Sequence, residues 1–219
     1  EKRAAFVEKI SLRSHIPVHT VLDLACGTGT MTALLTERGY ELIGVDGSED
    51  MLLEAREKAQ TLTGVPPLFL HQSMPELDLY GTVEAAICCL DSLNYLTDAR
   101  EVRETFRRLH LFIAPGGLLV FDINTVEKLA ALDGQVFLDE TEDTYCVWRT
   151  EFDEKKRLCY YGMDIFRLEG EHWQRSFEEH IEYAYEPAEL QQWLAEAGFT
   201  RIRSYGDRVL RAPKEAEQR

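Results

Sequence analysis

VLDLACGTGT, at Val21–Thr30, is the stretch of sequence that decides the fold. An apolar run that carries one acid, Asp23, breaks into a glycine turn, and an amphipathic helical pattern begins after it. Gly27 and Gly29 let the backbone turn sharply and approach a ligand that a Cβ would block. A strand, a glycine turn and a helix in this order are typical of a nucleotide-cradling loop, although a plain strand–helix turn needs no ligand.

The residues around this turn separate two kinds of cofactor loop. A dinucleotide loop carries a third glycine three residues after the second, but that position is Thr32 here, and Asp23 is not part of the dinucleotide pattern. A second apolar run, Glu41–Val45, ends in Asp46, which is placed to accept both hydroxyls of a ribose. These features argue against a nicotinamide dehydrogenase, an alternative that tight binding of a nicotinamide dinucleotide would revive.

The sequence resembles the class I S-adenosylmethionine-dependent methyltransferases. Asp46 stands where the ribose-binding acid of that family stands. The resemblance covers most of Val18–Thr125 and, more loosely, Glu178–Tyr205. It implies an enzyme with S-adenosylmethionine as cofactor and S-adenosylhomocysteine as product. The stretches that are similar to the first motif and to the fourth and fifth strand regions of the family are Val21–Gly29, Ala85–Leu96 and Leu111–Thr125.

The charge balance bounds the partners. The chain has 24 Lys and Arg against 39 Asp and Glu, a formal net charge of −15, with no stripe of basic residues. Such a chain repels phosphate backbones, so nucleic acids and anionic membranes are not expected as partners. A small-molecule methyl acceptor, above all one that bears an amine, fits better.

Cysteine usage indicates a reducing compartment. The five Cys have no metal-ligand spacing and the six His are scattered, so we expect reduced thiols in a cytoplasmic protein and no metal site. No apolar run reaches 18 residues and no signal peptide is evident. The chain starts at Glu1 without Met, so some N-terminal sequence is expected to lie outside it.

Alternating apolar runs and helical patterns predict a Rossmann-like α/β fold, a doubly wound and mostly parallel sheet with helices on both faces. The methyltransferase domain is expected at 1–133 and 186–219, with a helix opened by Pro187. The usual seventh strand either lies beyond the C-terminus or is poorly replaced by Arg208–Arg211. The six predicted strands are Thr20–Ala25, Glu41–Val45, Leu68–His71, Val83–Cys89, Leu118–Ile123 and Arg201–Tyr205.

Between Gln135 and Tyr185 the apolar period changes to two, which predicts an inserted three-stranded antiparallel sheet at 134–185, with strands near 136–150, 157–168 and 173–185. The insert is expected to be a substrate lid or a homodimer face. Together with FDINT, its stretch RSFEEHIEYAY resembles a bacterial subgroup of small-molecule methyltransferases that includes sugar amine N-methyltransferases. In the third strand an apolar face (Trp173, Phe177, Ile181, Tyr183, Tyr185) alternates with a polar one (Gln174, Glu178, His180, Glu182).

The resemblance also assigns the cofactor-binding residues. Asp23 and the glycine turn would hold the methionine end of the cofactor, and Asp46 would bind the ribose. The plainer interpretation is that Asp23 is a capped acid of the strand and that Asp46 is a turn acid at a strand end. Met51 would touch adenine unless it belongs to the core. Ser73 stands where the family has an adenine-binding Asp, and a hydroxyl can accept the same hydrogen bond. The full predicted set is Asp23, Ala25, Cys26, Gly27, Gly29, Thr30, Asp46, Gly47, Met51, Ser73, Met74, Leu90 and Asp91.

Methyl transfer from a sulfonium is an in-line displacement, so alignment and exclusion of water matter most and no strong catalytic signature is required. Asp91, Asn94 and Asp122 follow the fourth and fifth strands, where an open α/β sheet has its crevice. Clustered acids there would hold a cationic amine or favour the sulfonium electrostatically, whereas helix capping is the plainer role of Asp91. His180 is a candidate base or substrate ligand if its face covers the crevice, and otherwise belongs to a solvated charged face.

The sequence therefore predicts a methyltransferase that moves a methyl group to N or O of a small molecule. The alternative is a non-catalytic cofactor-binding or interaction module with the same fold, because the adenine residue is a weak match and the last strand is missing. Turnover across a panel of amines and hydroxyl compounds would exclude that alternative.

Overall fold

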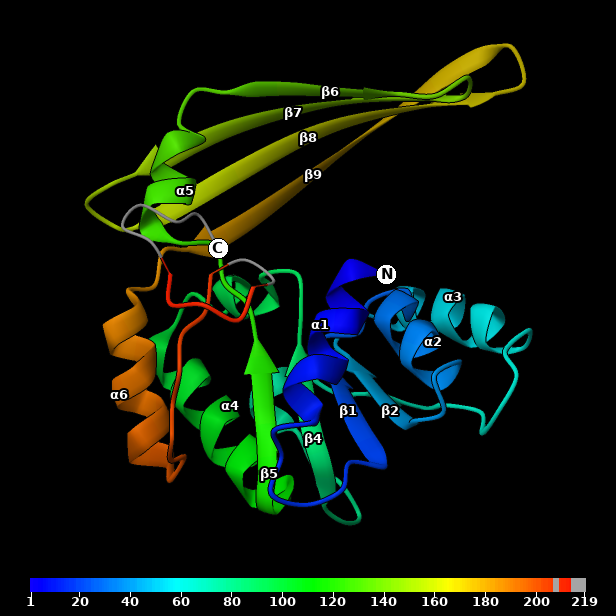
Figure 1. Cartoon of the computed structure of the whole chain (residues 1–219). Helices are drawn as coiled ribbons and strands as arrows, with labels where there is room; N and C mark the ends of the chain where they lie inside the picture. Colours follow the sequence, from blue (N-terminus) through cyan, green and yellow to red (C-terminus); the bar gives the residue numbers. More distant parts are fainter. Residues whose placement is uncertain (207–208, 214–219) are drawn as a thin grey trace.

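The computed structural model describes residues 1–206 and 209–213. Its helices lie on both faces of a parallel sheet, and a second sheet lies above one edge of the first (Figure 1). In chain order the elements are α1 (Lys2–Ser11), β1 (Thr20–Leu24), α2 (Thr30–Thr36), β2 (Glu41–Asp46), α3 (Glu49–Ala59), β3 (Leu68–His71), η1 (Met74–Glu76), β4 (Val83–Cys88), η2 (Ser92–Tyr95), α4 (Ala99–Phe112), β5 (Ile113–Phe121), α5 (Val126–Ala131), β6 (Val136–Glu140), β7 (Thr144–Asp153), β8 (Leu158–Glu169), β9 (His172–Tyr183) and α6 (Pro187–Ala197).

The first sheet has the order β3-β2-β1-β4-β5, and all its strand pairs are parallel. The predicted doubly wound fold is confirmed. Because the order reverses between β1 and β4, the loops after these two strands diverge and leave a crevice at their carboxyl ends. The glycine turn follows β1, so the fold places it at this crevice.

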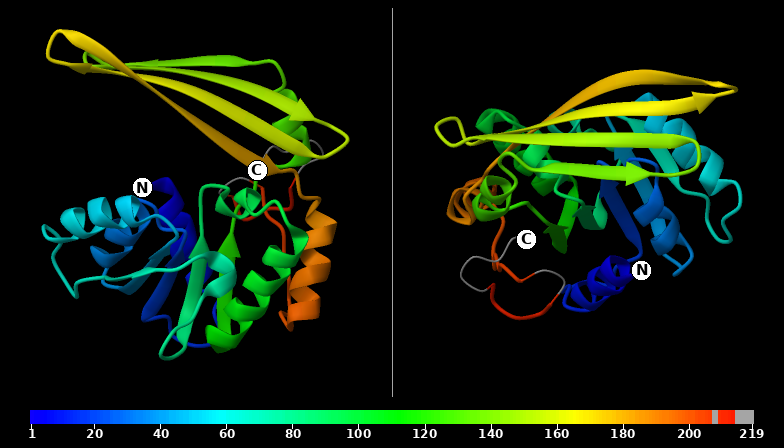
Figure 2. Two further views of the ribbon diagram at one scale, coloured as in Figure 1. Left: turned by 180° about the vertical axis from the view of Figure 1, so that it is seen from behind. Right: turned by 90° about the horizontal axis from the view of Figure 1, so that it is seen from above.

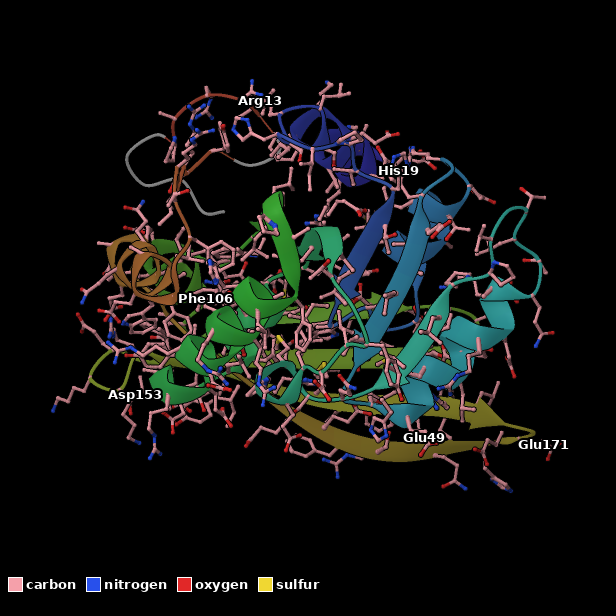
Figure 3. The ribbon with its side chains drawn as sticks, turned by 90° about the horizontal axis from the view of Figure 1, so that it is seen from below. Arg13, His19, Glu49, Phe106, Asp153 and Glu171 are labelled. Carbon is pink, nitrogen blue, oxygen red and sulfur yellow. The ribbon has the colours of Figure 1, made fainter. Side chains whose placement is uncertain are left out.

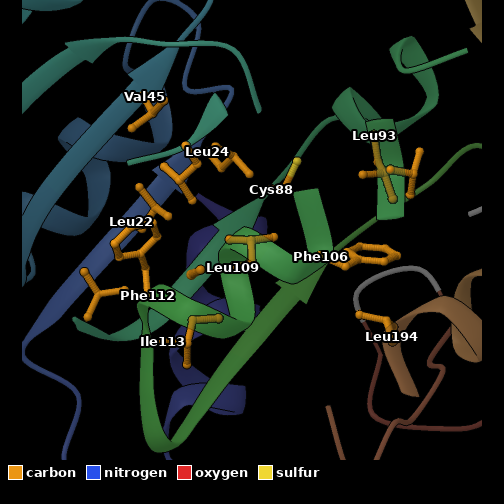
Figure 4. Packing of buried hydrophobic residues seen from close by; sticks show 14 of the residues in the cluster. Leu22, Leu24, Val45, Cys88, Leu93, Phe106, Leu109, Phe112, Ile113 and Leu194 are labelled. Atoms are coloured by element: carbon orange, nitrogen blue, oxygen red, sulfur yellow. The ribbon is translucent and has the colours of Figure 1, made fainter. Parts of the chain in front are cut away.

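The core explains why β1 is apolar almost throughout. Val21 packs with α1 and α2 on one face of the sheet, whereas Leu22 and Leu24 pack on the other face with α4 and α6. A strand that is covered on both faces needs no alternation of apolar and polar residues. Figure 4 shows the second of these layers, in which Phe106 from α4 lies between the sheet and Leu194 from α6. The exception in β1 is Asp23, a buried acid inside an apolar strand.

The predicted sixth strand, Arg201–Tyr205, is wrong: these residues form no strand. The side chain of Tyr205 instead docks on α1, where its hydroxyl accepts a hydrogen bond from Arg13 at 3.0 Å and its ring meets Phe6 edge-on. A cavity of about 1500 Å³ lies between this segment and β5, which is one of the two edge strands of the parallel sheet among the described residues. Residues 209–213 contain no strand, and Arg208 and 214–219 lie outside the described residues.

The inserted sheet is antiparallel, as predicted, but has four strands in the order β6-β7-β8-β9 rather than three. The stretch 136–150, expected as one strand, turns back between β6 and β7. Side chains make this turn, since Thr141 Oγ1 donates to Asp143 at 2.8 Å and accepts from the Thr144 N–H at 3.0 Å. Neither Gly nor Pro marks the turn, which is why the sequence pattern does not reveal it.

The inserted sheet crosses above the carboxyl edge of the parallel sheet (Figure 2). Asp153, at the β7–β8 turn, lies on the side of α4, whereas Glu171, at the β8–β9 turn, lies at the opposite end on the side of α3 and Glu49 (Figure 3). The polar face of β9 is the one turned toward the parallel sheet, because Glu182 is buried there and His180 meets a residue of η2. The apolar face looks outward.

The two glycines of the turn are required for different reasons, and alanine substitutions can distinguish these reasons. Gly27 and Gly29 both have positive φ, but only at Gly29 would a Cβ meet a neighbour, Ala55 Cβ at 2.9 Å. We expect Gly29→Ala to lower the free energy of unfolding by about 2–4 kcal/mol, from left-handed strain plus overpacking.

The matched control is Gly27→Ala, with strain alone and an expected loss of about 1–2 kcal/mol. Urea unfolding measures both. Equal losses in the two variants would contradict the close approach of the turn to α3.

Candidate active site

The glycine turn joins β1 to α2 and is open on one side. Ala25, Gly27 and Gly29 have φ of 56°, 54° and 71°, so the chain runs repeatedly through the left-handed region. No heavy atom lies within 4 Å of the place where a Cβ on Gly27 would stand, so this part of the turn faces free space. Positive φ at a residue with a side chain, such as Ala25, is the kind of strain found at binding sites.

Asp46 joins the glycine turn to the end of β2. Its Oδ2 accepts the N–H of Gly27 at 2.7 Å, and its Oδ1 accepts the N–H of Ser48 at 2.9 Å. The two predicted halves of the cofactor site are thus in direct contact. The carboxylate is held in one orientation, while each oxygen keeps a second lone pair for another donor.

Asp23 is the buried acid behind the turn, with 2% of its surface exposed. Thr32 Oγ1 donates a hydrogen bond to it at 2.6 Å. Burial raises the pKa of Asp23 to about 6, although the hydrogen bonds from Thr32 oppose the rise. Thr32 therefore has a role of its own, whereas the sequence pattern used it only as the position of a missing glycine.

Cys26 and Thr30 complete the predicted residues of the turn. Burial, reinforced by the nearby Asp23, raises the pKa of the Cys26 thiol far above its ordinary value, so it stays protonated. Thr30 Oγ1 accepts a hydrogen bond from Lys58 Nζ at 3.1 Å, and the same ammonium donates to the Thr28 carbonyl at 2.7 Å. Lys58 of α3 thus connects the turn to α3 through these two hydrogen bonds.

The remaining predicted cofactor residues lie on three loops. Met51 is 45% exposed, so it does not belong to the core. The Ser73 hydroxyl donates to Glu76 at 2.6 Å, and Met74 packs against the main core. The Gly47 carbonyl lies 2.9 Å from His71 Nε2. Leu90, after β4, has a φ of 64° and is 55% exposed.

The end of β4 is tied to the end of β5. Asp91 has a φ of 53°, and its N–H donates to Asp122 Oδ1 at 3.2 Å. Asp122 Oδ2 in turn pairs with Arg3 of α1 at 3.1 Å. Two of the acids predicted near the transferring methyl are therefore brought together, and one of them carries its own cation.

Asn94, the third of these predicted residues, is fully buried and joins three segments. Its amide nitrogen donates to the carbonyls of Asn124 and Tyr183, each at 2.9 Å, and its oxygen accepts the N–H of Asn124 at 3.0 Å. Every bond to Asn124 or Tyr183 uses the backbone of the partner. Asn94 therefore fixes the ends of β5 and β9 against η2, which is a structural role.

Asn124 links two carboxylates. Its amide nitrogen donates to Asp91 Oδ2 at 3.0 Å and to Glu182 Oε2 at 2.7 Å, while its oxygen accepts from Lys128 Nζ at 2.7 Å. Glu182 is 3% exposed, and burial raises its pKa, with the hydrogen bond from Asn124 opposing and the charge of Asp91 adding to the rise. The alternation of apolar and polar residues places Glu182 on the polar face of its strand but predicts no role for it in the site.

Aromatic side chains close the same region. Tyr95 of η2 meets His180 edge-on, with ring centroids 5.8 Å apart. Burial, with the charges of Glu182 and Asp91, raises the pKa of Tyr95 to about 12. His180 Nε2 lies 3.5 Å from Glu178, a contact that is charged only when the imidazole is protonated. The face that carries His180 is thus turned to the crevice, which was the condition for its predicted role.

The described residues contain neither a metal-ligand cluster nor a membrane-spanning helix. No group of three or more His, Cys, Asp or Glu side chains in 1–206 and 209–213 is arranged to hold a metal ion. Within the same residues, no helix is long and apolar enough to cross a membrane.

Comparisons with known proteins bear on this site. The family described as "Methyltransferase domain" matches residues 21–117. YqeM of Bacillus subtilis (strain 168), which carries the name of a methyltransferase, is 35% identical over 181 residues, covering 82% of this chain and 72% of YqeM. The dTDP-3-amino-3,4,6-trideoxy-alpha-D-glucopyranose N,N-dimethyltransferase of Streptomyces venezuelae is 31% identical over 113 residues, 51% of this chain and 45% of that protein.

A solved structure resembles almost the whole chain. It is a crystal structure of an S-adenosylmethionine-dependent methyltransferase from Clostridium acetobutylicum ATCC 824, with a TM-score of 0.89 and 26% identity. The match covers 99% of this chain and 87% of that one. The similarity therefore extends over the inserted sheet as well as the parallel sheet.

The buried acid of β1 generates a pH-dependent stability. Because the folded pKa of Asp23, about 6, exceeds its ordinary value of 3.8, the folded state binds more protons between these two values. The contribution of Asp23 to the unfolding free energy therefore falls as pH rises from about 4 to about 6, by about 3 kcal/mol in all, and is level above pH 6.

The difference between the parent and Asp23→Asn in urea unfolding at each pH isolates this contribution. Thr32→Val removes a hydrogen bond that lowers the pKa, so the fall should continue to higher pH, whereas Thr32→Ser should behave like the parent. If the unfolding free energies of the parent chain and of Asp23→Asn change in parallel with pH, this result would contradict the burial of an ionisable Asp23.

Proposed function

Because the chain belongs to the class I S-adenosylmethionine-dependent methyltransferases, we propose that it transfers the methyl group to the nitrogen of a small-molecule amine. The cluster of acidic side chains at the ends of β4, β5 and β9 carries this proposal. Asp91, Asp122 and Glu182 contribute three carboxylates, and Arg3 and Lys128 are hydrogen-bonded to members of the cluster. A group of carboxylates at one place suits an acceptor that arrives as an ammonium.

The cofactor residues fit a sulfonium nucleoside. The space in front of Gly27 lets a ligand approach the main chain, and Asp46, with lone pairs to spare beside it, suits a ribose diol. Asp23, behind the same turn, suits the amino group at the methionine end. S-adenosylmethionine supplies an electrophilic methyl when it is bound, so the protein has to orient the acceptor and exclude water rather than activate the donor.

The acceptor side is formed by the insert and by the ends of β4 and β5. In this proposal Asp91 holds the ammonium, and the Tyr95–His180 pair covers the crevice from the side of β9. His180 is the candidate that takes the proton of the ammonium, since the nitrogen needs a free lone pair for in-line attack. The amine named in the Streptomyces venezuelae relative agrees with nitrogen rather than oxygen as the methylated atom.

The insert is also proposed to form a homodimer. Its outward face exposes Val136, Leu138, Trp173 and Phe177, with 63%, 52%, 51% and 54% of their surfaces accessible. These apolar side chains lie on the edge strands β6 and β9, and the ion pairs of Asp164 with Arg149 and Arg175 lie on the same face. Exposed apolar residues combined with polar and arginine side chains are typical of a protein interface. The boundaries proposed for the insert remain 134–185, and those of the methyltransferase domain 1–133 and 186–219.

Turnover tests the proposed reaction. The chain is incubated with S-adenosylmethionine and glycine, ethanolamine or a 3-amino sugar nucleotide, and S-adenosylhomocysteine is measured. We expect turnover with an amine and none with matched hydroxyl compounds. Asp46→Ala should raise the dissociation constant for S-adenosylmethionine at least about 10-fold in calorimetry, since charge-assisted hydrogen bonds are lost.

The control for this variant is Glu49→Gln, an exposed acid three residues further on, which should leave the affinity unchanged. Turnover confined to hydroxyl acceptors would overturn nitrogen as the methylated atom. An unchanged affinity in Asp46→Ala would remove Asp46 from the cofactor site.

Sedimentation tests the dimer. We expect the parent chain to sediment as a dimer and Phe177→Glu as a monomer, because a charge would be buried in an apolar interface. Tyr80→Glu is the matched control, since Tyr80 is fully exposed on the methyltransferase domain. A monomeric parent chain, or a dimer that Phe177→Glu leaves intact, would contradict an interface through the insert.

A further inference from the structure

Glu182 is a buried acid of the inserted sheet that is hydrogen-bonded by a residue of the methyltransferase domain. It belongs to β9 of the insert, but the amide that binds it belongs to Asn124, after β5. Asn94 fixes the backbone on either side of this contact through the carbonyls of Asn124 and Tyr183. The Glu182–Asn124 pair is therefore held from both ends rather than by its own hydrogen bond alone.

The amide of Asn124 can take only one orientation here. Lys128 Nζ donates to its oxygen, so its nitrogen must face the two carboxylates, and each N–H serves one of them. Since the two N–H bonds diverge by 120°, the Asp91 and Glu182 oxygens are held about 5 Å apart. A shift of Glu182 would turn the amide and with it the carboxylate of Asp91.

We propose that Glu182 is a positioning residue for the acceptor: through the amide of Asn124 it fixes the Asp91 carboxylate at the crevice where the amine binds. This inference rests on the proposed function, because it takes Asp91 as the group that meets the ammonium. The backbone of Asp91 has a φ of 53°, and its N–H donates to Asp122 Oδ1 at 3.2 Å, so the main chain that carries this carboxylate is itself held at the end of β5.

Charge adds to the effect of geometry. Burial and the charge of Asp91 both raise the pKa of Glu182, and the coupling is reciprocal, so the Glu182 charge acts on Asp91 in the same way. Among the described residues, the charged or titratable groups that face Glu182 are Asp91 after β4, Tyr95 of η2, Lys128 of α5, and Cys159 and Tyr161 of β8. A hydrogen bond with Tyr161 stabilises the carboxylate form.

The test follows Asp91 directly. Carbon-13 NMR titration of the side-chain carboxyls is carried out on the full chain, and the Asp91 signal is assigned by its loss in Asp91→Asn. Glu182→Gln keeps the shape but removes the charge, so we expect the pKa of Asp91 to fall by about one unit. Should this variant fail to fold, Glu182→Asp, which withdraws the charge by one methylene, is expected to give a smaller fall.

Glu178→Gln is the matched control, because Glu178 lies on the same face of β9 but is exposed. It should leave the Asp91 titration unchanged. If the Glu182→Gln variant has the same Asp91 pKa as the parent chain, the proposal is overturned.

Kinetics distinguish the positioning role of Glu182 from the proposed methylation of an amine. With the amine that the parent chain methylates, Glu182→Gln should raise the KM for the amine about 10-fold and leave the KM for S-adenosylmethionine unchanged. An equal rise in both KM values, or in neither, overturns the positioning role. If the parent chain methylates no amine, the proposed function fails, while the NMR titration still decides whether Glu182 acts on Asp91.

Discussion

The contact between Asp46 and the glycine turn is the constraint on which the site depends. One carboxylate at the end of β2 accepts the Gly27 N–H at 2.7 Å and thereby joins the loops of two neighbouring parallel strands. The turn reaches this carboxylate only because its backbone has positive φ, and it can pack on α3 only because Gly29 has no side chain. The proposed cofactor side of the crevice follows from these requirements.

The acceptor side depends on a different principle, which is contact between distant segments. Asn94, Asn124 and Glu182 come from η2, the end of β5 and the last strand of the insert, and their amide and carboxylate groups satisfy one another in a buried place. A buried polar network of this kind is stable only when nearly all its members have partners. The contacts of the proposed cofactor loops join residues at most 30 positions apart in the chain, whereas those of the proposed acceptor side join residues up to 89 positions apart.

This difference explains what could be predicted from the sequence. The parallel sheet, the turn at Gly27 and the closeness of Asp46 follow from apolar runs and glycine spacing, which are local signals. The turn at Thr141 was not predicted because threonine and aspartate side chains form it. The strand expected at Arg201–Tyr205 does not form, and Tyr205 docks beside α1 instead. Glu182 could not be singled out, since its partner Asn124 lies 58 residues earlier in the chain.

The bridge that Asn94 makes between Asn124 and Tyr183 has a consequence for how such proteins diverge. The side chain of Asn94 binds the carbonyls at both junctions of the insert, Asn124 after β5 and Tyr183 at the end of β9, so the two ends of this segment are fixed in place. Lengthening or rebuilding a loop with fixed ends costs little free energy. Changes of length or sequence between Asn124 and Tyr183 are therefore expected to leave the contact between Gly27 and Asp46 undisturbed.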